Sequence, residues 1–110
     1  MTGDVEDATL GGYFRIHERP PAFEGLDGEA YSVAIYVDEE CGPDGSFGGA
    51  LLFVRWSPAG EEPTGHVETG YLARARSTEE VEAAIRALTL HQVKDELDRA
   101  LTRAREPVEW

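Results

Sequence analysis

Apolar and polar residues follow two different periods along this chain. In several segments before about residue 74 they alternate, which is typical of β-strands, whose successive side chains point to opposite faces. Beyond Ser77 apolar residues recur every three or four positions, which is typical of an amphipathic helix. The sequence therefore predicts strands in the first part of the chain and helical structure in the last part.

Four segments show the alternation expected of strands: residues 13–18, 29–38, 47–57 and 66–74. In the first of them, Phe14 and Ile16 fall on one face, and Tyr13, Arg15 and His17 fall on the other. The third has apolar residues on both faces. We therefore expect the third strand to be central, and either covered on both sides or covered once with its second face used for contact.

The helical segment begins with a capping signal, because Ser77 and Thr78 precede three glutamates. Two apolar stripes follow, and a five-residue step from Leu88 to Val93 separates them. Residues 89–92 have the Thr-x-x-Gln pattern of a capping box, which would start a new helix. The pattern predicts either one long bent helix or two helices with a joint near residues 88–90.

Strands joined by turn-sized links and followed by helix predict an α+β fold. We expect an antiparallel four-stranded β-meander with the C-terminal helix, or the two helices, packed on one face. Residues 1–110 are interpreted as a single domain, with a frayed lead-in at residues 1–9 and a tail at residues 106–110.

Charge narrows the range of partners. The chain has 110 residues, with 22 acidic residues against 10 Lys and Arg, and a net charge of −12. It lacks the clustered cations that bind nucleic acid or an anionic membrane surface. Residues 1–50 hold 11 acidic and 2 basic residues, whereas residues 51–110 hold 11 and 8. This uneven distribution favours a basic protein partner, and adaptation to a salt-rich cytoplasm is the alternative explanation of the acidity.

The compartment is predicted from absent signals and from one cysteine. No secretory signal opens the sequence, and no apolar run is long enough to span a bilayer. Cys41 is the single cysteine, which is typical of a reducing compartment. We therefore expect a cytoplasmic protein. Glu39 and Glu40 beside Cys41 disfavour a reactive thiolate, because nearby anions raise a thiol pKa.

No catalytic motif is present, so an enzyme is less favoured than a binding protein. The acidic cluster at residues 38–44 lacks the spacing of a calcium loop. His17, His66 and His91 come from distant parts of the chain, and a simple meander would not bring them together. The sequence thus predicts neither a metal site nor a cofactor.

The most informative candidate site is the sheet face opposite the helix. If the helix covers Phe14, Val33 and Leu52, the other face combines aromatic and cationic residues, and such patches commonly mark contact surfaces. The alternative is that loop 20–26 or the tail folds over it. The candidate ligand or interface residues on this face are Tyr13, Arg15, His17, Tyr36, Leu51, Phe53, Arg55 and His66.

Two functional hypotheses follow. The first is a non-enzymatic protein-interaction module that self-associates through this face as a homodimer and meets a basic protein with its acidic half. The second is a domain or enzyme that binds a small anionic molecule with the arginine, histidine and tyrosine side chains of the same face.

Overall fold

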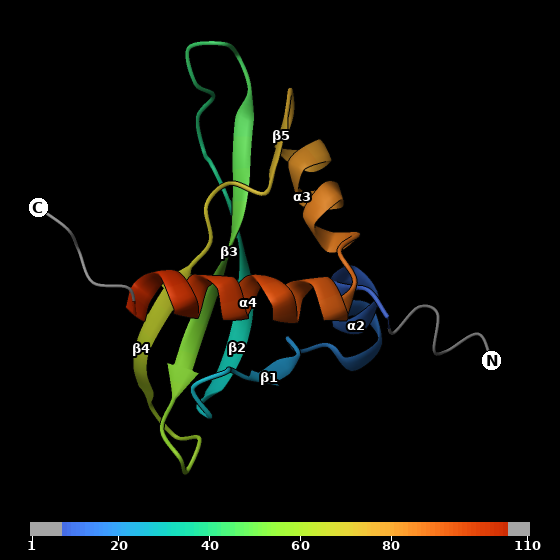
Figure 1. Cartoon of the computed structure of the whole chain (residues 1–110). Coiled ribbons are helices and arrows are strands. Elements are labelled where there is room, and N and C mark those ends of the chain that lie inside the picture. The colour runs from blue at the N-terminus through green and yellow to red at the C-terminus, as the bar shows by residue number, and fades with distance from the viewer. Residues whose placement is uncertain (1–7, 106–110) are drawn as a thin grey trace, which may run out of the picture.

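The structure is a computed structural model, and it describes residues 8–105. Figure 1 shows an antiparallel sheet with α4 lying across it. The described elements follow in the order α2 (Leu10–His17), β1 (Ala22–Glu24), β2 (Ala30–Val37), β3 (Phe47–Trp56), β4 (Pro63–Glu68), β5 (Ala73–Ala75), α3 (Thr78–Arg86) and α4 (Leu90–Arg105).

The sheet has the order β1-β2-β3-β4, and every pair is antiparallel. Strand β5 also pairs with β3, so β4 and β5 follow each other along the same edge of β3. The outer edge is irregular between them. Leu52 pairs with Glu68 of β4, and Gly49 pairs with Ala73 of β5. Between these two pairs β3 spans three residues, whereas the segment that runs from β4 to β5 spans five. Two extra residues are therefore accommodated between β4 and β5.

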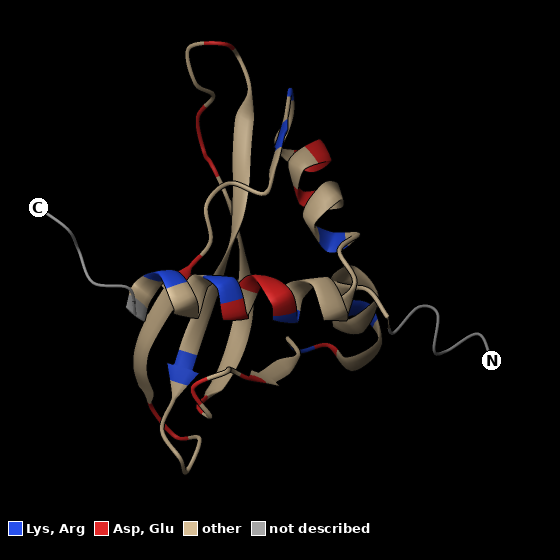
Figure 2. Cartoon of the chain, in the orientation of Figure 1, with Lys and Arg blue, Asp and Glu red and all other residues tan. Residues whose placement is uncertain are grey.

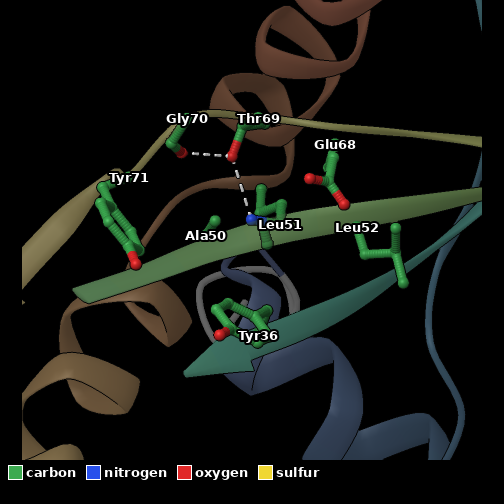
Figure 3. A pocket seen from close by; sticks show the side chains of 8 residues that line it. All are labelled: Tyr36, Ala50, Leu51, Leu52, Glu68, Thr69, Gly70 and Tyr71. Atoms are coloured by element: carbon green, nitrogen blue, oxygen red, sulfur yellow. Dashed lines mark hydrogen bonds between the residues drawn. The ribbon is translucent and has the colours of Figure 1, made fainter. Parts of the chain in front are cut away.

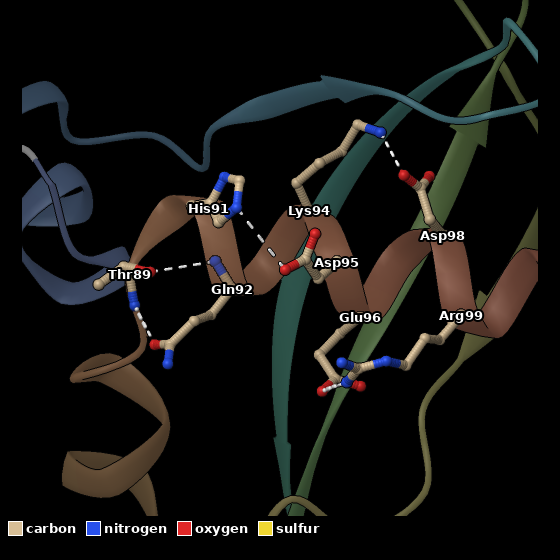
Figure 4. A network of polar contacts seen from close by, with 8 residues as sticks. All are labelled: Thr89, His91, Gln92, Lys94, Asp95, Glu96, Asp98 and Arg99. Carbon is tan, nitrogen blue, oxygen red and sulfur yellow. Dashed lines mark hydrogen bonds and ion pairs between the residues drawn. The ribbon is translucent and has the colours of Figure 1, made fainter.

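The predicted fold class is confirmed. The chain forms an α+β fold in which an antiparallel sheet carries the C-terminal helix on one face. The sequence left open whether the C-terminal part forms one bent helix or two helices, and the structure has two, α3 and α4. The Thr89 hydroxyl accepts from the Gln92 N–H at 3.0 Å, and the Gln92 side chain accepts from the Thr89 N–H at 2.9 Å (Figure 4). This capping box lies at the predicted joint and starts α4.

Residues 13–17 are helical, so the strand predicted for residues 13–18 is wrong. The Thr9 hydroxyl caps α2 by accepting from the Gly12 N–H, and Glu18 ends the helix in a left-handed conformation with φ 56°. Leu10 and Phe14 are also four residues apart, as one face of a helix requires, and Leu10 is fully buried. An alternation over six residues is therefore compatible with a helix as well as with a strand. The first strand among the described residues is instead β1.

The last predicted strand, residues 66–74, is also corrected. Its first part belongs to β4, which starts earlier at Pro63, and its end belongs to β5. The lead-in predicted at residues 1–9 lies outside the described residues except for Ala8 and Thr9, and the tail at residues 106–110 lies outside them entirely. Thr9 is not frayed, because it caps α2 and forms a β-bridge with Thr89.

The core lies between the sheet and the helices. On the sheet side, Val33 pairs with Phe53 and Ile35 with Leu51, so these four side chains share one face. The helices bury this face with apolar residues of both α3 and α4. The buried cluster comprises Leu10, Tyr31, Val33, Leu51, Phe53, Val81, Ile85, Val93, Leu97 and Leu101.

Helix α3 approaches β3 most closely at Gly49. A Cβ atom at this position would lie 2.4 Å from Val81 Cγ1 and 2.7 Å from Ile85 Cδ1. Real Cβ atoms do not make such contacts, and core side chains are packed too densely to move aside freely. The absence of a side chain at Gly49 therefore sets how near α3 lies to the sheet.

We predict that Gly49→Ala lowers the free energy of unfolding by about 1–3 kcal/mol, as overpacked cores do. In a Val81→Ala background the same change is expected to cost less, because the nearest obstructing atom is gone. Gly70→Ala is the matched control, since a Cβ there meets no atom within 4 Å. Urea unfolding of the four variants measures this, and equal costs of Gly49→Ala in both backgrounds would contradict it.

Candidate functional site

The face of the sheet opposite the helices is covered by no element between residues 8 and 105. Because strand residues alternate, the register places one set of side chains from three strands on this side. We call it the open face, formed by Ser32, Ala34 and Tyr36 of β2, Ala50, Leu52, Val54 and Trp56 of β3, and His66 and Glu68 of β4. On the two central strands this set carries no formal charge.

Trp56 is held within the open face by a hydrogen bond. Its indole N–H donates to the Ser32 hydroxyl at 2.9 Å, across the β2–β3 pair. A half-buried indole usually needs a partner for its N–H, and this one is satisfied within the chain. The ring is thus fixed against β2, and its apolar atoms contribute to the open face.

At the hairpin end, two tyrosines share one carboxylate. The Tyr36 hydroxyl donates to Asp38 Oδ1 at 2.9 Å, and the Tyr71 hydroxyl lies 2.9 Å from both Asp38 oxygens. The Gly48 N–H donates to Asp38 Oδ2 at 3.1 Å. The two tyrosine side chains remain about half exposed, at 51% and 50%. They are therefore surface residues whose hydroxyl groups are fixed in place.

Tyr71 reaches this position because of the break between β4 and β5. Thr69 bridges the break, since its hydroxyl accepts from the Leu51 N–H and donates to the Gly70 carbonyl (Figure 3). The Tyr71 ring then lies against Gly48, where a Cβ atom would come within 2.6 Å of it. The Arg74 guanidinium carbon lies 4.7 Å from the centre of the ring, a cation–π contact that also holds Tyr71.

These hydrogen bonds shift the pKa values of all three groups. The Tyr71 hydroxyl is the main cause of a lowered pKa at Asp38; partial desolvation opposes it, while the Tyr36 hydroxyl, the Gly48 N–H and the Arg74 charge support it. The same hydrogen bonds to Asp38 are the main cause of a raised pKa at both Tyr36 and Tyr71. At neutral pH the group is therefore one carboxylate with two neutral phenol donors.

A hollow of about 530 Å³ lies between the two tyrosines and β4 (Figure 3). Tyr36 and Tyr71 line it on one side and Glu68 on the other, and Ala50 and Leu52 contribute its apolar surface. Within residues 8–105 no group of three histidine, cysteine or acidic side chains is arranged to hold a metal ion. The arrangement presents fixed aromatic and apolar surface, which suits contact with another molecule.

The structure does not bring the eight predicted site residues together. Tyr36 and His66 lie on the open face as expected. Leu51, Phe53 and Arg55 lie on the helix-covered face, where the first two are 0% exposed. Tyr13, Arg15 and His17 lie on α2. The expectation of one shared exposed face is therefore wrong, and a ligand-binding role for these residues stays a prediction.

Leu51 and Phe53 lie on the face opposite to the predicted one for a simple reason. Both sets of alternate residues in β3 are apolar, and choosing the wrong set moves every side chain to the other face. The helix was expected to cover Leu52, which instead lies on the open face. Arg55 follows its neighbours Leu51 and Phe53, and it donates to the Thr64 hydroxyl and carbonyl at 3.0 Å each.

Asp38 and Tyr71 were missed as members of the site. Asp38 could have been found from the sequence, because it follows Tyr36 by two residues and so falls on the same face. Tyr71 gave no such signal. Its position depends on the two extra residues between β4 and β5, and unbroken alternation through residues 66–74 conceals them.

Comparisons with known proteins yield no relative, because no family model, curated protein or solved structure matches the chain. None of the helices in the described part of the chain has the length and apolarity needed to span a bilayer.

We predict that Asp38→Asn destabilises the fold at neutral pH and that the difference disappears in acid. A carboxyl whose pKa is lowered on folding stabilises the protein above its unfolded pKa, and this stabilisation is lost as pH falls through the folded value. The ordinary pKa of an aspartate is 3.8, so the stabilities of the wild-type protein and of Asp38→Asn should become equal below about pH 4. Thermal unfolding across a pH series measures this. Glu39→Gln makes the same charge change in the same turn, and a gap that persists unchanged at low pH would contradict the prediction.

Proposed function

We propose that this chain is a non-enzymatic protein-interaction module that self-associates through its open face. The observation that carries the proposal is an uncovered sheet face in which Leu52, Val54 and Trp56 stand side by side on alternate positions of the central strand. Sheets normally bury apolar faces against another layer, and a second copy would supply that layer.

The residues on this face suit protein contact. Tyrosine and tryptophan are enriched at interfaces, where they bury large areas and few rotatable bonds are restricted. Here Trp56 is tied to Ser32, and Tyr36 and Tyr71 are tied to Asp38. Side chains that are already ordered lose less entropy on binding, which favours association.

Charge favours a second copy as the partner on this face. Two molecules of net charge −12 repel each other unless they meet where charge is low. The side chains of β2 and β3 on the open face are uncharged. Acidic residues lie instead along the β2–β3 hairpin (Figure 2). A basic protein, the other partner considered, would instead be drawn to that hairpin, which carries Asp38, Glu39, Glu40 and Asp44.

Binding of a small anionic molecule has less support. It required Arg15, Arg55 and His66 on one surface, and these residues lie on α2, on the helix-covered face of β3 and on the open face of β4, respectively. A cytoplasmic location fits the exposed, single Cys41, because a reducing compartment would keep it as a thiol.

We predict that Leu52→Arg weakens self-association at least about tenfold, because a charge at the centre of the open face must be desolvated in the contact. Glu68 is the cross-strand neighbour of Leu52 and can pair with the new charge, so the fold is expected to survive. Ala104→Arg, at an exposed position of α4, makes the same charge change and should have no effect. Light scattering across a concentration series measures the molar mass, and an unchanged mass for Leu52→Arg would refute the proposal.

A further inference from the structure

The outer edge of β2 is only partly paired. Strand β1 covers residues Ala30–Ser32, and no strand among the described residues pairs with the rest of this edge. The Asp38 N–H donates to the Gly48 carbonyl, which places even-numbered residues in the hydrogen-bonded pairs with β3. In an antiparallel sheet the alternate residues then direct their N–H and C=O groups to the other side. Beyond the residues next to β1, Ile35 and Val37 therefore present these groups along the outer edge.

Residues 33–37 themselves carry no charged side chain, no proline and no bulge. Natural edges are guarded by charged side chains, prolines or bulges, because unpaired backbone groups accept a strand from another molecule. Residues 33–37 read Val-Ala-Ile-Tyr-Val, and their pairing with β3 is regular throughout. Such an edge is able to accept a strand.

A shallow groove of about 410 Å³ lies beside this edge. Phe14 and Pro20 line it together with Glu82 and Arg86 of α3, next to Val33 and Ile35. The Arg86 guanidinium lies 3.6 Å from the Glu82 carboxylate and 5.5 Å from the centre of the Phe14 ring. Because its one cation is already paired, the groove suits an apolar side chain.

We propose that β2 of a second copy adds to this edge in antiparallel orientation, about a two-fold axis at Tyr36. In this register Ile35 of each copy exchanges two backbone hydrogen bonds with Val37 of the other. The two Tyr36 side chains stand directly opposite each other on the open face, where aromatic cross-strand pairs are favourable. Val37 lies on the helix side and reaches the groove of the other copy.

Charge complementarity identifies the second copy as the occupant. The strand that adds to the edge continues from Val37 into Asp38, whose carboxylate stays with Tyr36 and Tyr71 on the open face, and then into Glu39. In the proposed register Glu39 lies opposite Val33, which lines the groove together with Pro20. The exposed Arg19 precedes Pro20 and is one of only two basic residues in positions 1–50. The two-fold axis makes this contact twice, so two otherwise repulsive molecules gain two attractive pairs.

The edge contact depends on the outward backbone groups of Ile35 and Val37, whereas the open-face contact depends on side chains of β3 such as Leu52, so each contact can be broken without the other. If both form, two edge-joined sheets pack face to face and the assembly has four copies. Leu52→Arg should then leave an edge-joined dimer, whose molar mass is half that of the wild-type assembly. Adding Ile35→Pro should halve the mass again, because proline removes the outward N–H while leaving the bonds to β3 intact. Ile35→Ala is the matched control: it loses the side chain, keeps the N–H, and should remain dimeric.

Light scattering of these variants separates failure of this inference from failure of the proposed function. A monomeric Leu52→Arg protein, or one whose dimer persists with Ile35→Pro, overturns the edge contact, even if another protein's peptide is later found to bind there. A mass unaffected by Leu52→Arg overturns the open-face contact instead, and Ile35→Pro in the wild-type background still decides the edge contact.

Disulfide trapping tests the register if the Ile35→Pro protein does not fold. In a Cys41→Ser, Leu52→Arg background, Tyr36→Cys places two thiols opposite each other across the axis, within the Cα separation that a disulfide needs. Ala34→Cys is the control, because the two copies of this position lie four residues apart along the strands, about 13 Å. Non-reducing electrophoresis should show a covalent dimer for Tyr36→Cys alone. No dimer, or equal dimer in both, overturns the proposed register.

Discussion

Two adjacent residues without side chains, Gly48 and Gly49, determine what can approach each face of the central strand. On one face, the space left at Gly49 admits Val81 and Ile85, and so allows α3 to close the core. On the other, the space left at Gly48 admits the ring of Tyr71, which then reaches Asp38. Because neighbouring residues of a strand point to opposite sides, the pair connects the packing of the core with the geometry of the open face.

The central strand also explains why one apolar face has no cover. Strand β3 pairs along both edges, and its alternate residues Leu51 and Phe53 are buried by the helices. The residues between them are apolar as well, but the three helices among the described residues supply only one covering layer. Aromatic groups fixed by hydrogen bonds remain on the uncovered side. The proposed self-association follows from this excess of apolar strand surface over helix.

The sequence was sufficient for features that depend on local patterns. The helix joint at the Thr89–Gln92 capping box and the central place of β3 could be read from spacing, whereas spacing left open whether one bent helix or two would form. The sequence was insufficient where the same pattern of apolar residues is compatible with two different local structures. Residues 13–17 fit a strand and a helix equally, and the tertiary contacts of Leu10 and Phe14 decided between them. The face of Leu51 was ambiguous because its neighbours are equally apolar, and Tyr71 depended on an irregularity that alternation does not reveal.

The irregular edge has a further consequence for how this chain can change in evolution. The extra length between β4 and β5 is two residues, which equals the side-chain period of a strand. Both strands therefore keep the orientation that an unbroken strand would have. Losing a pair of residues here would shorten the connection and gaining a pair would lengthen it. In both cases Arg74 would stay on the open-face side of the sheet. Losing a single residue would turn Arg74 towards Val81 and the core, so insertions and deletions at this point should be tolerated in even numbers only.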